Sequence, residues 1–262
     1  MKQEERNINA AFYIPFAYLY CVRLRSVPKV ASWLLLYILP TAFYASLDAL
    51  TYLLVLFATF SLYELGYIMN DTVAVRREEQ PSLRLSDNET RYFFAHKWTI
   101  IATRLLIAAS CLSVLHSFTP SLFCALSLVI MCLLFALYNR WRNRYNVFLY
   151  GWLVFSRYLP FMMLEHHAWW LYALLFVSYP LLIGLERFSM PAYRWPLMRI
   201  LIPNEESKTL FRAIYYTVLL CLLLPLWWWE KQDFLFLLPI GILWLYRVSR
   251  YVWSLCATTA PR

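Results

Sequence analysis

Long apolar stretches dominate the pattern of hydrophobic and polar positions along the chain. Eight of them reach or approach the ~20 residues that a helix needs to cross the hydrocarbon core of a bilayer. These predicted spans cover residues 28–47, 49–70, 98–115, 119–138, 146–164, 168–185, 210–229 and 234–254. A shorter apolar segment, 10–22, is interpreted as an interfacial helix, with a ninth, half-inserted element as the alternative. The pattern predicts an all-α integral membrane protein, a single domain over residues 1–262 with eight or nine transmembrane helices.

Composition and cysteine spacing narrow the class of protein further. Hydrophobic residues make up 62% of the 262 residues and charged residues only 15%, as expected for a chain that lies mainly in lipid. Glu4 and Glu5 precede the first apolar run and no small-residue cleavage site follows it, so we expect no cleavable signal peptide. The six cysteines are scattered without a CxxC pair, which predicts neither a metal site nor a disulfide framework.

The net charge of +9 reflects an uneven distribution of basic residues between the two sides of the predicted spans. With a cytoplasmic N-terminus, 21 of the 24 lysines and arginines fall on the cytoplasmic side, and the opposite loops hold only Lys231. This positive-inside pattern predicts that both termini are cytoplasmic. The charge therefore sets orientation and does not indicate binding to nucleic acid. With the compact chain, it is typical of a bacterial inner membrane protein, and the basic loops favour an anionic lipid headgroup or a phosphorylated substrate.

The two longest loops between predicted spans, 71–97 and 186–209, both lie on the predicted cytoplasmic side. Functional residues concentrate in loops that a rigid scaffold positions, so we expect the site at this end of the protein, beneath these two loops. Ser86 followed by Glu89 has the spacing of a capping box and predicts the start of the helix that leads into the third span.

Three carboxylates near the end of the second span are the first candidates for chemistry. Glu64, Asp71 and Glu78 are spaced by seven and seven residues, which places them on one face of a continuing helix. Carboxylates on one face can hold Mg²⁺, which would neutralise a diphosphate leaving group. Asn70 would add a hydrogen bond to phosphate or to a metal-bound water. The alternative is a solvated helix end whose carboxylates pair with Arg76 and Arg77.

Glu64 lies about two turns inside a predicted span, where an ionisable residue is costly and normally has a partner. Arg104 and Arg157, which also lie inside spans, are the candidates for that partner. Such a pair is either structural or forms the wall of a polar cavity, and the sequence leaves both open.

The segment from Tyr63 to Leu85 resembles the first acidic motif of the UbiA superfamily of intramembrane transferases, NDxxDxxxD. Asn70 and Asp71 match its first two positions, Ala74 replaces the middle Asp, and Glu78 replaces the last. The Pro-Ser-Leu-Arg segment that ends at Arg84 resembles the Pro-x-x-Arg that often follows in the family. Tyr138 opens a second, basic segment that is similar to the family's fifth-helix motif. The resemblance implies a UbiA-like helical bundle whose cavity opens to the cytoplasm and to lipid.

The second acidic motif of UbiA-type prenyltransferases has no counterpart in the loop 186–209, which contains no Asp. Glu186-Arg187, followed by Arg194 and Arg199, stands there instead. This stretch is similar to that of the polyprenyl-phosphate phosphoribosyltransferase branch, which also tends to have an arginine in the fifth helix, as Arg157 is here. With one acidic motif, arginines must meet the remaining phosphate charge, and guanidinium groups suit phosphate through bidentate contacts.

The resemblance implies a Mg²⁺-dependent membrane transferase that acts on a polyprenyl lipid. The favoured reaction moves a phosphoribosyl-type group from a diphosphate-containing donor to polyprenyl phosphate. Asp71, Asn70 and Glu78 would be the catalytic residues, with Asp71, Glu78 and Glu64 as metal ligands. Substrate would be bound by Arg76, Arg77, Arg84, Arg187, Arg194, Arg157, Arg104, Glu64 and Tyr138. The alternatives are a prenyltransferase that uses a prenyl diphosphate, and a non-catalytic membrane subunit on the same fold, for which Ala74 is the best evidence.

Overall fold

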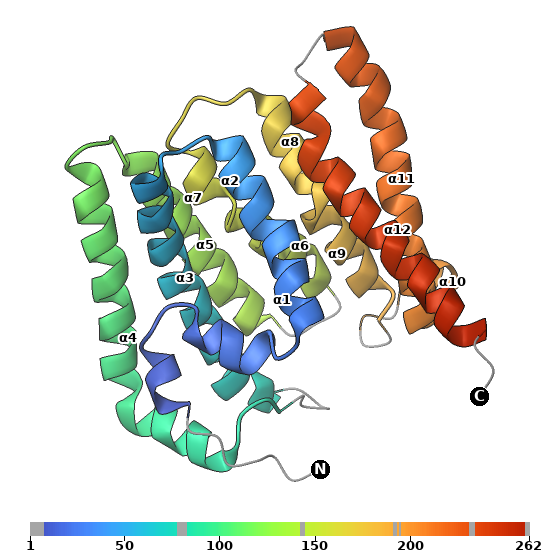
Figure 1. Ribbon diagram of the computed structural model, residues 1–262. Coiled ribbons are helices and arrows are strands. Elements are labelled where there is room, and N and C mark those ends of the chain that lie inside the picture. The colour runs from blue at the N-terminus through green and yellow to red at the C-terminus, as the bar shows by residue number, and fades with distance from the viewer. Residues whose placement is uncertain are drawn as a thin grey trace.

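The computed structural model describes residues 8–77, 83–141, 145–190, 193, 195–230 and 234–259, and these residues form helices and connecting segments with no β-strand. The helices run roughly side by side along one long axis (Figure 1). In chain order, the main elements are α1 (Val27–Trp33), η3 (Leu34–Ile38), α2 (Leu39–Ala45), α3 (Ala49–Thr72), η4 (Ala74–Arg77), α4 (Asp87–His116), α5 (Leu122–Arg140), α6 (Asn146–Ser156), α7 (Leu159–Met162), α8 (Trp169–Ser178), α9 (Pro180–Phe188), α10 (Pro196–Leu201), α11 (Glu205–Glu230), η6 (Phe234–Leu237) and α12 (Leu238–Thr259).

Six helical segments in the described residues are long and apolar enough to cross a membrane, which makes the chain a multi-pass membrane protein by length and hydropathy. They correspond to six of the eight predicted spans: Val27–Ala45, Ala49–Arg77, Asp87–His116, Leu122–Arg140, Trp169–Phe188 and Ser207–Pro225. The predicted span 146–164 is divided into α6 and α7, because the helix breaks at Arg157 and Tyr158 shortly before Pro160. The predicted span 234–254 becomes η6 and α12, and α12 carries Arg247 and Arg250 in its sequence.

The N-terminal segment differs from the prediction of one interfacial helix. It forms two short turns, η1 (Asn9–Phe12) and η2 (Leu19–Arg23), the second of them a π-helical turn. Phe16 between them has a φ of 69°, a left-handed conformation that interrupts a helix. The prediction of a continuous helix was wrong because segment 10–22 follows the shape of the bundle beneath it, where its backbone finds partners in buried side chains.

Two helix starts are fixed by side-chain caps. Ser86 and Glu89 form the predicted capping box at the start of α4, since the Ser86 amide donates to Glu89 Oε2 at 2.7 Å and the Glu89 amide donates to Ser86 Oγ at 3.3 Å. Asp48 caps α3 by accepting hydrogen bonds from the amides of Leu50 and Thr51 at 3.0 and 3.1 Å. Both caps set the ends of the long helices that carry the candidate site.

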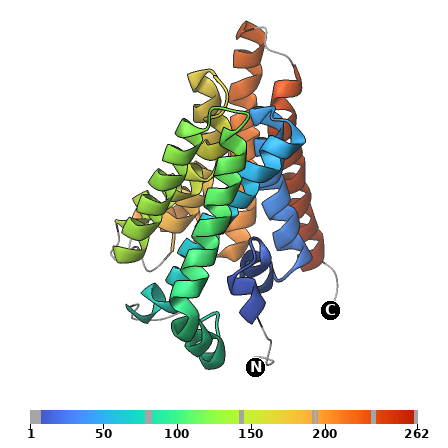
Figure 2. The same cartoon turned by 90° about the vertical axis from the view of Figure 1, so that its left-hand side faces the viewer.

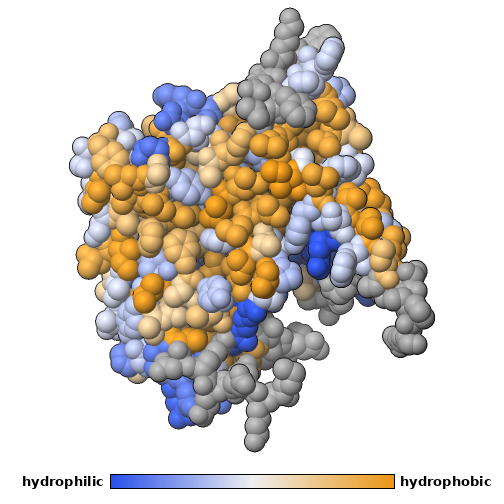
Figure 3. Space-filling model, in the orientation of Figure 1, coloured by the Kyte–Doolittle hydropathy of each residue, from blue (hydrophilic) through white to orange (hydrophobic). Residues whose placement is uncertain are grey.

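The connections place the predicted cytoplasmic segments together. Two views show the N-terminal turns and the start of α4 at the same end of the bundle (Figures 1 and 2). The end of α12 and helix α10 lie at that end as well (Figure 1). The described parts of 71–97 and 186–209 therefore lie at one end, as expected. Much of the face shown in Figure 3 is hydrophobic, with hydrophilic side chains gathered at a few places, which suits helices that face lipid.

Candidate functional site

Interruptions in three helical segments meet around one buried arginine, Arg157. The first is the π-helical η3, which contains Tyr37; the second is the α6–α7 junction at Arg157 itself; the third is the α8–α9 junction at Tyr179, whose φ and ψ are −146° and −49°. Local departures from α-helical geometry of this kind are frequent at functional sites. They bring polar groups and aromatic rings into the middle of the bundle.

Tyrosine rings surround the Arg157 guanidinium, which is only 7% exposed. Its Cζ lies 4.8 Å from the ring centroid of Tyr37, 5.6 Å from those of Tyr158 and Tyr179, and 5.7 Å from that of Tyr63. Its Nε has no hydrogen-bond partner, and no carboxylate in the described residues forms an ion pair with it. Cation–π contacts offset part of the cost of burying this charge but leave it without a counter-ion.

A second arginine, Arg187 on α9, has a similar environment. Its Nη1 donates hydrogen bonds to the hydroxyls of Tyr138 at 2.7 Å and Tyr193 at 3.2 Å. Its Cζ lies 3.6 Å from the ring centroid of Tyr150 on α6. Of the ion pairs among the described residues, none includes Arg187. Two predicted substrate residues, Arg187 and Tyr138, are thus in direct contact.

The two arginines lie along the same helix interface. A Cβ built on Gly151 would lie 3.6 Å from the Pro180 carbonyl oxygen, so α6 passes close to the α8–α9 junction there. Tyr150 and Tyr179 are the chain neighbours of these two residues, and they contact Arg187 and Arg157 respectively. Arg157 and Arg187 therefore lie on the two sides of one tyrosine-lined interface.

Asp71, the central residue of the predicted motif, is 4% exposed and has cationic and polar partners. Arg23 binds both of its carboxylate oxygens, with Nη2 to Oδ1 at 2.6 Å and Nε to Oδ2 at 3.1 Å. Arg84 Nη1 donates to Oδ1 at 3.0 Å, and Asn70 Nδ2 donates to the same oxygen at 3.2 Å. The hydroxyl of Tyr18 donates to Oδ2 at 2.9 Å. Asn70, Asp71 and Arg84 are thus in direct contact.

The environment of Asp71 also affects its partners. Burial and, next, the charge of Asp71 raise the pKa of Tyr18 well above its ordinary range, so its hydroxyl stays protonated and can donate. Burial lowers the pKa of Arg23, but the Asp71 carboxylate, Tyr67 and Tyr18 together outweigh it and the net pKa is raised. The Arg23 guanidinium lies 4.2 Å from the Tyr67 ring centroid, and the Tyr67 and Tyr63 centroids are 4.9 Å apart. Tyr63 in turn contacts Arg157, which links the Asp71 cluster to the tyrosine-lined interface.

Glu64 has a separate role from Asp71, although both side chains face the N-terminal segment as their spacing predicts. Arg104 Nη1 donates to Glu64 Oε2 at 2.6 Å, and both side chains have no exposed surface. The amides of Phe16 and Leu19 donate to the same carboxylate at 2.9 and 2.6 Å. Arg104 also donates to backbone carbonyls of the N-terminal segment, those of Phe12 at 2.9 Å, Ala11 at 3.0 Å and Ile14 at 3.1 Å. Of the two partners considered, Arg104 is the one that pairs with Glu64, and the pair anchors the N-terminal segment.

The described residues do not fit the predicted set of metal ligands. Seven residues of helix separate Glu64 from Asp71 by about 10 Å along the axis, and the two carboxylates bind different arginines. Each carboxylate is already occupied by arginine and other donors. Among the described residues there is no group of three His, Cys, Asp or Glu side chains that could hold a metal. Glu78, the third predicted ligand, lies outside the described residues.

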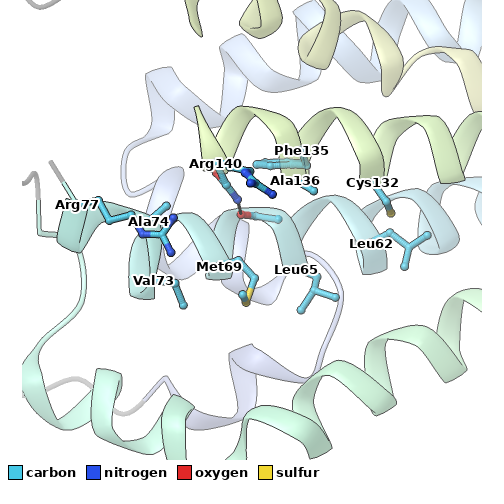
Figure 4. Close-up of a pocket in the computed structure, with 12 residues that line it drawn as sticks. Leu62, Leu65, Met69, Val73, Ala74, Arg77, Cys132, Phe135, Ala136 and Arg140 are labelled. Atoms are coloured by element: carbon cyan, nitrogen blue, oxygen red, sulfur yellow. Dashed lines mark hydrogen bonds between the residues drawn. The ribbon is translucent and has the colours of Figure 1, made fainter. Parts of the chain in front are cut away.

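A groove of about 640 Å³ lies between α3 and α5. Most of its lining is apolar, including Leu65 and Met69 on α3 and Phe135 on α5, while Arg77 and Arg140 lie at one end (Figure 4). Phe135 also faces the interior, since its ring centroid is 5.0 Å from that of Tyr63. The groove is therefore separated from the tyrosine-lined interface by one aromatic side chain.

The remaining predicted residues fall in two groups. Arg76 is exposed, and its guanidinium lies 4.8 Å from the ring centroid of Phe94, away from Asp71. Arg194 lies outside the described residues.

Sequence reasoning missed Arg23, Tyr18, Arg140 and most of the tyrosines. The count of 20 tyrosines and the four-residue spacing of Tyr63 and Tyr67 were the available signals. Any one of these rings has an equally good explanation as an interfacial or packing residue, so the pattern alone did not single them out.

No family model, curated protein or solved structure matches the chain.

Proposed function

We propose that the chain is an intramembrane transferase, with a UbiA-like bundle and a cytoplasm-facing site, that acts on a phosphorylated polyprenyl lipid. The observation that carries the proposal is the pair formed by the buried Arg157 and the half-buried Arg187, which have no carboxylate partner among the described residues. A buried, uncompensated charge is expensive, and one inside a membrane protein marks a substrate or ion site. A phosphate group would supply the missing negative charge and accept the free guanidinium donors.

The tyrosines give this pocket a second property that suits phosphate. Arg187 already holds the hydroxyls of Tyr138 and Tyr193, which can turn to donate hydrogen bonds to a bound oxyanion. Neutral donors placed beside fixed cations bind an anion without adding a carboxylate that would repel it. The resemblance to the phosphoribosyltransferase branch also falls on Arg157 and Arg187.

The groove supports a long apolar substrate. Its apolar lining on α3 and α5 suits an isoprenoid chain, and Arg77 and Arg140 at one end suit the phosphate that such a chain carries. Asp71 lies at the end of α3 and Arg77 in η4, which follows it, so lipid phosphate and donor would meet at one end of the bundle.

The reaction that we favour is a displacement at the anomeric carbon of an activated sugar phosphate. An oxygen of the lipid phosphate forms a bond to that carbon while the bond from the carbon to the diphosphate breaks, and the diphosphate leaves with the electron pair. The nucleophile is already an anion, so no general base is needed. The arginines would stabilise the charge that develops on the departing diphosphate.

Mg²⁺ has no step in this scheme, because the described donor set does not fit an ion held by the protein. When bound to a diphosphate, Mg²⁺ would neutralise part of its charge. The requirement for Mg²⁺ stays a prediction.

The test is a product assay with the full chain in lipid nanodiscs. The protein is incubated with polyprenyl phosphate and phosphoribosyl pyrophosphate, with Mg²⁺ or with EDTA, and extracted lipids are analysed by mass spectrometry. We expect the wild type to form a phosphoribosylated lipid. Arg187→Gln should form about 100-fold less of this product, which is the loss typical for removing one charge-stabilising donor. Arg91→Gln, an exposed position on α4, is the matched control and should retain full activity.

Two other outcomes separate the alternatives. A prenylated aromatic acid formed from a prenyl diphosphate would favour the prenyltransferase. No product with any donor, together with tight binding of polyprenyl phosphate, would favour a non-catalytic membrane subunit. The occupation of Asp71 by Arg23 and Arg84 is the observation that keeps this last alternative open.

A further inference from the structure

A second, basic pocket is lined by residues other than those of the proposed transferase site. It has a volume of about 180 Å³ and is formed by α1, α11 and α12. Its polar lining consists of Lys29, Ser32, Thr209, Arg212, Arg247 and Arg250. Figure 3 shows strongly hydrophilic side chains gathered in a hollow beside the lower half of α12.

The charge of the pocket is strongly positive. Of its four cationic side chains, only Arg212 has a carboxylate partner in the described residues, Glu186, which it binds with two hydrogen bonds of 2.6 Å each. Lys29, Arg247 and Arg250 have no carboxylate partner among the described residues, and no Asp or Glu lines the pocket. Three cations around a small volume repel one another unless an anion lies between them.

Arg247 shows that the pocket is more than a patch of surface charge. It is 8% exposed, and its Nε is buried without a hydrogen-bond partner. Among the described residues, its guanidinium makes a cation–π contact with its neighbour Tyr246, whose ring centroid is 5.2 Å from Arg247 Cζ. A buried arginine that lines a pocket and has a donor without an acceptor is a ready site for an anionic oxygen.

The walls of the pocket are fixed by hydrogen bonds between helices. The hydroxyls of Ser32 on α1 and Tyr246 on α12 are 2.7 Å apart, and Trp244 Nε1 on α12 donates to Thr217 Oγ1 on α11 at 2.9 Å. These contacts hold the three helices together at the level of the pocket. Binding an anion there needs little rearrangement, which favours affinity.

The surroundings identify the source of the anion. The pocket is lined by residues of α1, α11 and α12, and the start of α1 and the end of α12 lie at the end of the bundle that carries the basic segments (Figure 1). Exposed apolar side chains continue from it along both helices, with Ile214 on α11 at 51% exposure and Trp253 on α12 at 73%. Surface of this kind faces acyl chains, so a phosphate that reaches the pocket from the membrane would have its chains beside α11 and α12.

We propose that the pocket formed by Lys29, Arg247 and Arg250 binds the phosphate group of an anionic membrane lipid. The site does not depend on the transferase function and would hold a structural or regulatory lipid against α1, α11 and α12. A free phosphate compound shares the same chemistry, and the experiment separates the two sources.

The test measures lipid binding by the full chain. Purified protein is titrated with phosphatidylglycerol or with phosphatidylcholine of the same acyl chains, and bound lipid is counted by native mass spectrometry. We expect phosphatidylglycerol to bind at least about tenfold more tightly than phosphatidylcholine. Lys29→Gln and Arg250→Gln, both at exposed positions that folding tolerates, should together remove that preference, and Arg247→Gln should do the same. Arg91→Gln should bind as the wild type does.

Three results would overturn the proposal. Equal binding of the two lipids by the wild type would exclude an anion-selective site, and an unchanged preference in the double variant would place the site elsewhere. Displacement of phosphatidylglycerol by an equal concentration of inorganic phosphate would exclude a lipid as the occupant. Arg157→Met should keep the lipid preference, so failure of the transferase proposal and failure of this one are distinguishable.

Discussion

Arg104 and Arg157 are two buried arginines that the sequence presents in the same way, and the structure gives them opposite environments. Arg104 is fully buried with a complete set of partners, the Glu64 carboxylate and three backbone carbonyls. Arg157 is almost as buried, at 7% exposure, and has tyrosine rings around it with no carboxylate partner in the described residues. The first is satisfied by the protein itself, whereas the function proposed above gives the second a partner from outside.

The comparison shows how structural and functional charges in a membrane protein can be told apart. In a structural ion pair each charge is neutralised by its partner, so loss of the pair should lower the free energy of unfolding. A charge kept for a ligand is a cost in the free protein, and its loss should appear in binding or activity. The predictions below test this distinction.

The largest effect is expected from Glu64→Gln. The substitution leaves the Arg104 charge buried without its counter-ion and loosens the anchor of the N-terminal segment, which should cost about 3–5 kcal/mol of unfolding free energy. Thermal unfolding of the detergent-solubilised protein measures it. An unchanged melting temperature would mean that Glu64 and Arg104 do not form the pair described here.

Arg157→Met should give the opposite result. Removing an uncompensated charge relieves its desolvation, while the lost cation–π contacts limit the net change in stability to less than about 2 kcal/mol. Transfer activity should fall about 100-fold, because the phosphate loses a charged donor. A loss of stability as large as that of Glu64→Gln, with activity intact, would make Arg157 a structural residue.

Gly66→Ala tests the wall between the groove and the tyrosine-lined interface. A Cβ at Gly66 would lie 2.4 Å from atoms of the Phe135 ring, so α3 and α5 would have to separate. Overpacking of this kind costs about 1–3 kcal/mol, and here it should also disturb both sites that share Phe135.

The matched control is Gly184→Ala on α9, where a Cβ would meet nothing within 4 Å. That change should stabilise the protein by about 0.5–1 kcal/mol through the helix propensity of alanine. Equal effects of the two substitutions on the melting temperature would mean that the close approach at Gly66 is not rigid.

The sequence predicted the helical class, six of the membrane spans and the cap at Ser86, because each depends on local hydropathy and spacing. It could not predict the division of span 146–164, since a proline such as Pro160 does not by itself decide whether a membrane helix breaks, and the tyrosines that receive the Arg157 side chain belong to other helices. The two turns of the N-terminal segment were missed for the same reason. Their conformation is set by Glu64 and Arg104 from α3 and α4.

Of the residues predicted for the candidate site, Asp71 and Arg84 lie in one cluster and Arg187 and Tyr138 in another. The sequence could not assign partners. Two arginines were equal candidates to pair with Glu64, and only packing distinguishes them. Arg23 was missed because it belongs to a basic segment whose positive charge already had an explanation in membrane orientation.

The smallest effect on stability is expected from replacing the two arginines that bind Asp71. The Arg23 side chain is 19% exposed, binds both carboxylate oxygens and stacks on Tyr67, whereas the Arg84 side chain is 37% exposed and gives Asp71 one hydrogen bond. Arg23→Gln should therefore cost about 1–2 kcal/mol of unfolding free energy, because buried hydrogen bonds to a charged group are lost.

Arg84→Gln should cost less than about 1 kcal/mol, since water screens an exposed pair. If Asp71 belongs with Arg157 and Arg187 as part of a substrate site, Arg84→Gln should still weaken transfer more than it weakens the fold. For each variant, the loss of transfer activity can be divided by the loss of stability. If this ratio is the same for Arg23→Gln and Arg84→Gln, Asp71 belongs instead with Glu64, as a carboxylate whose partners hold the N-terminal segment in place.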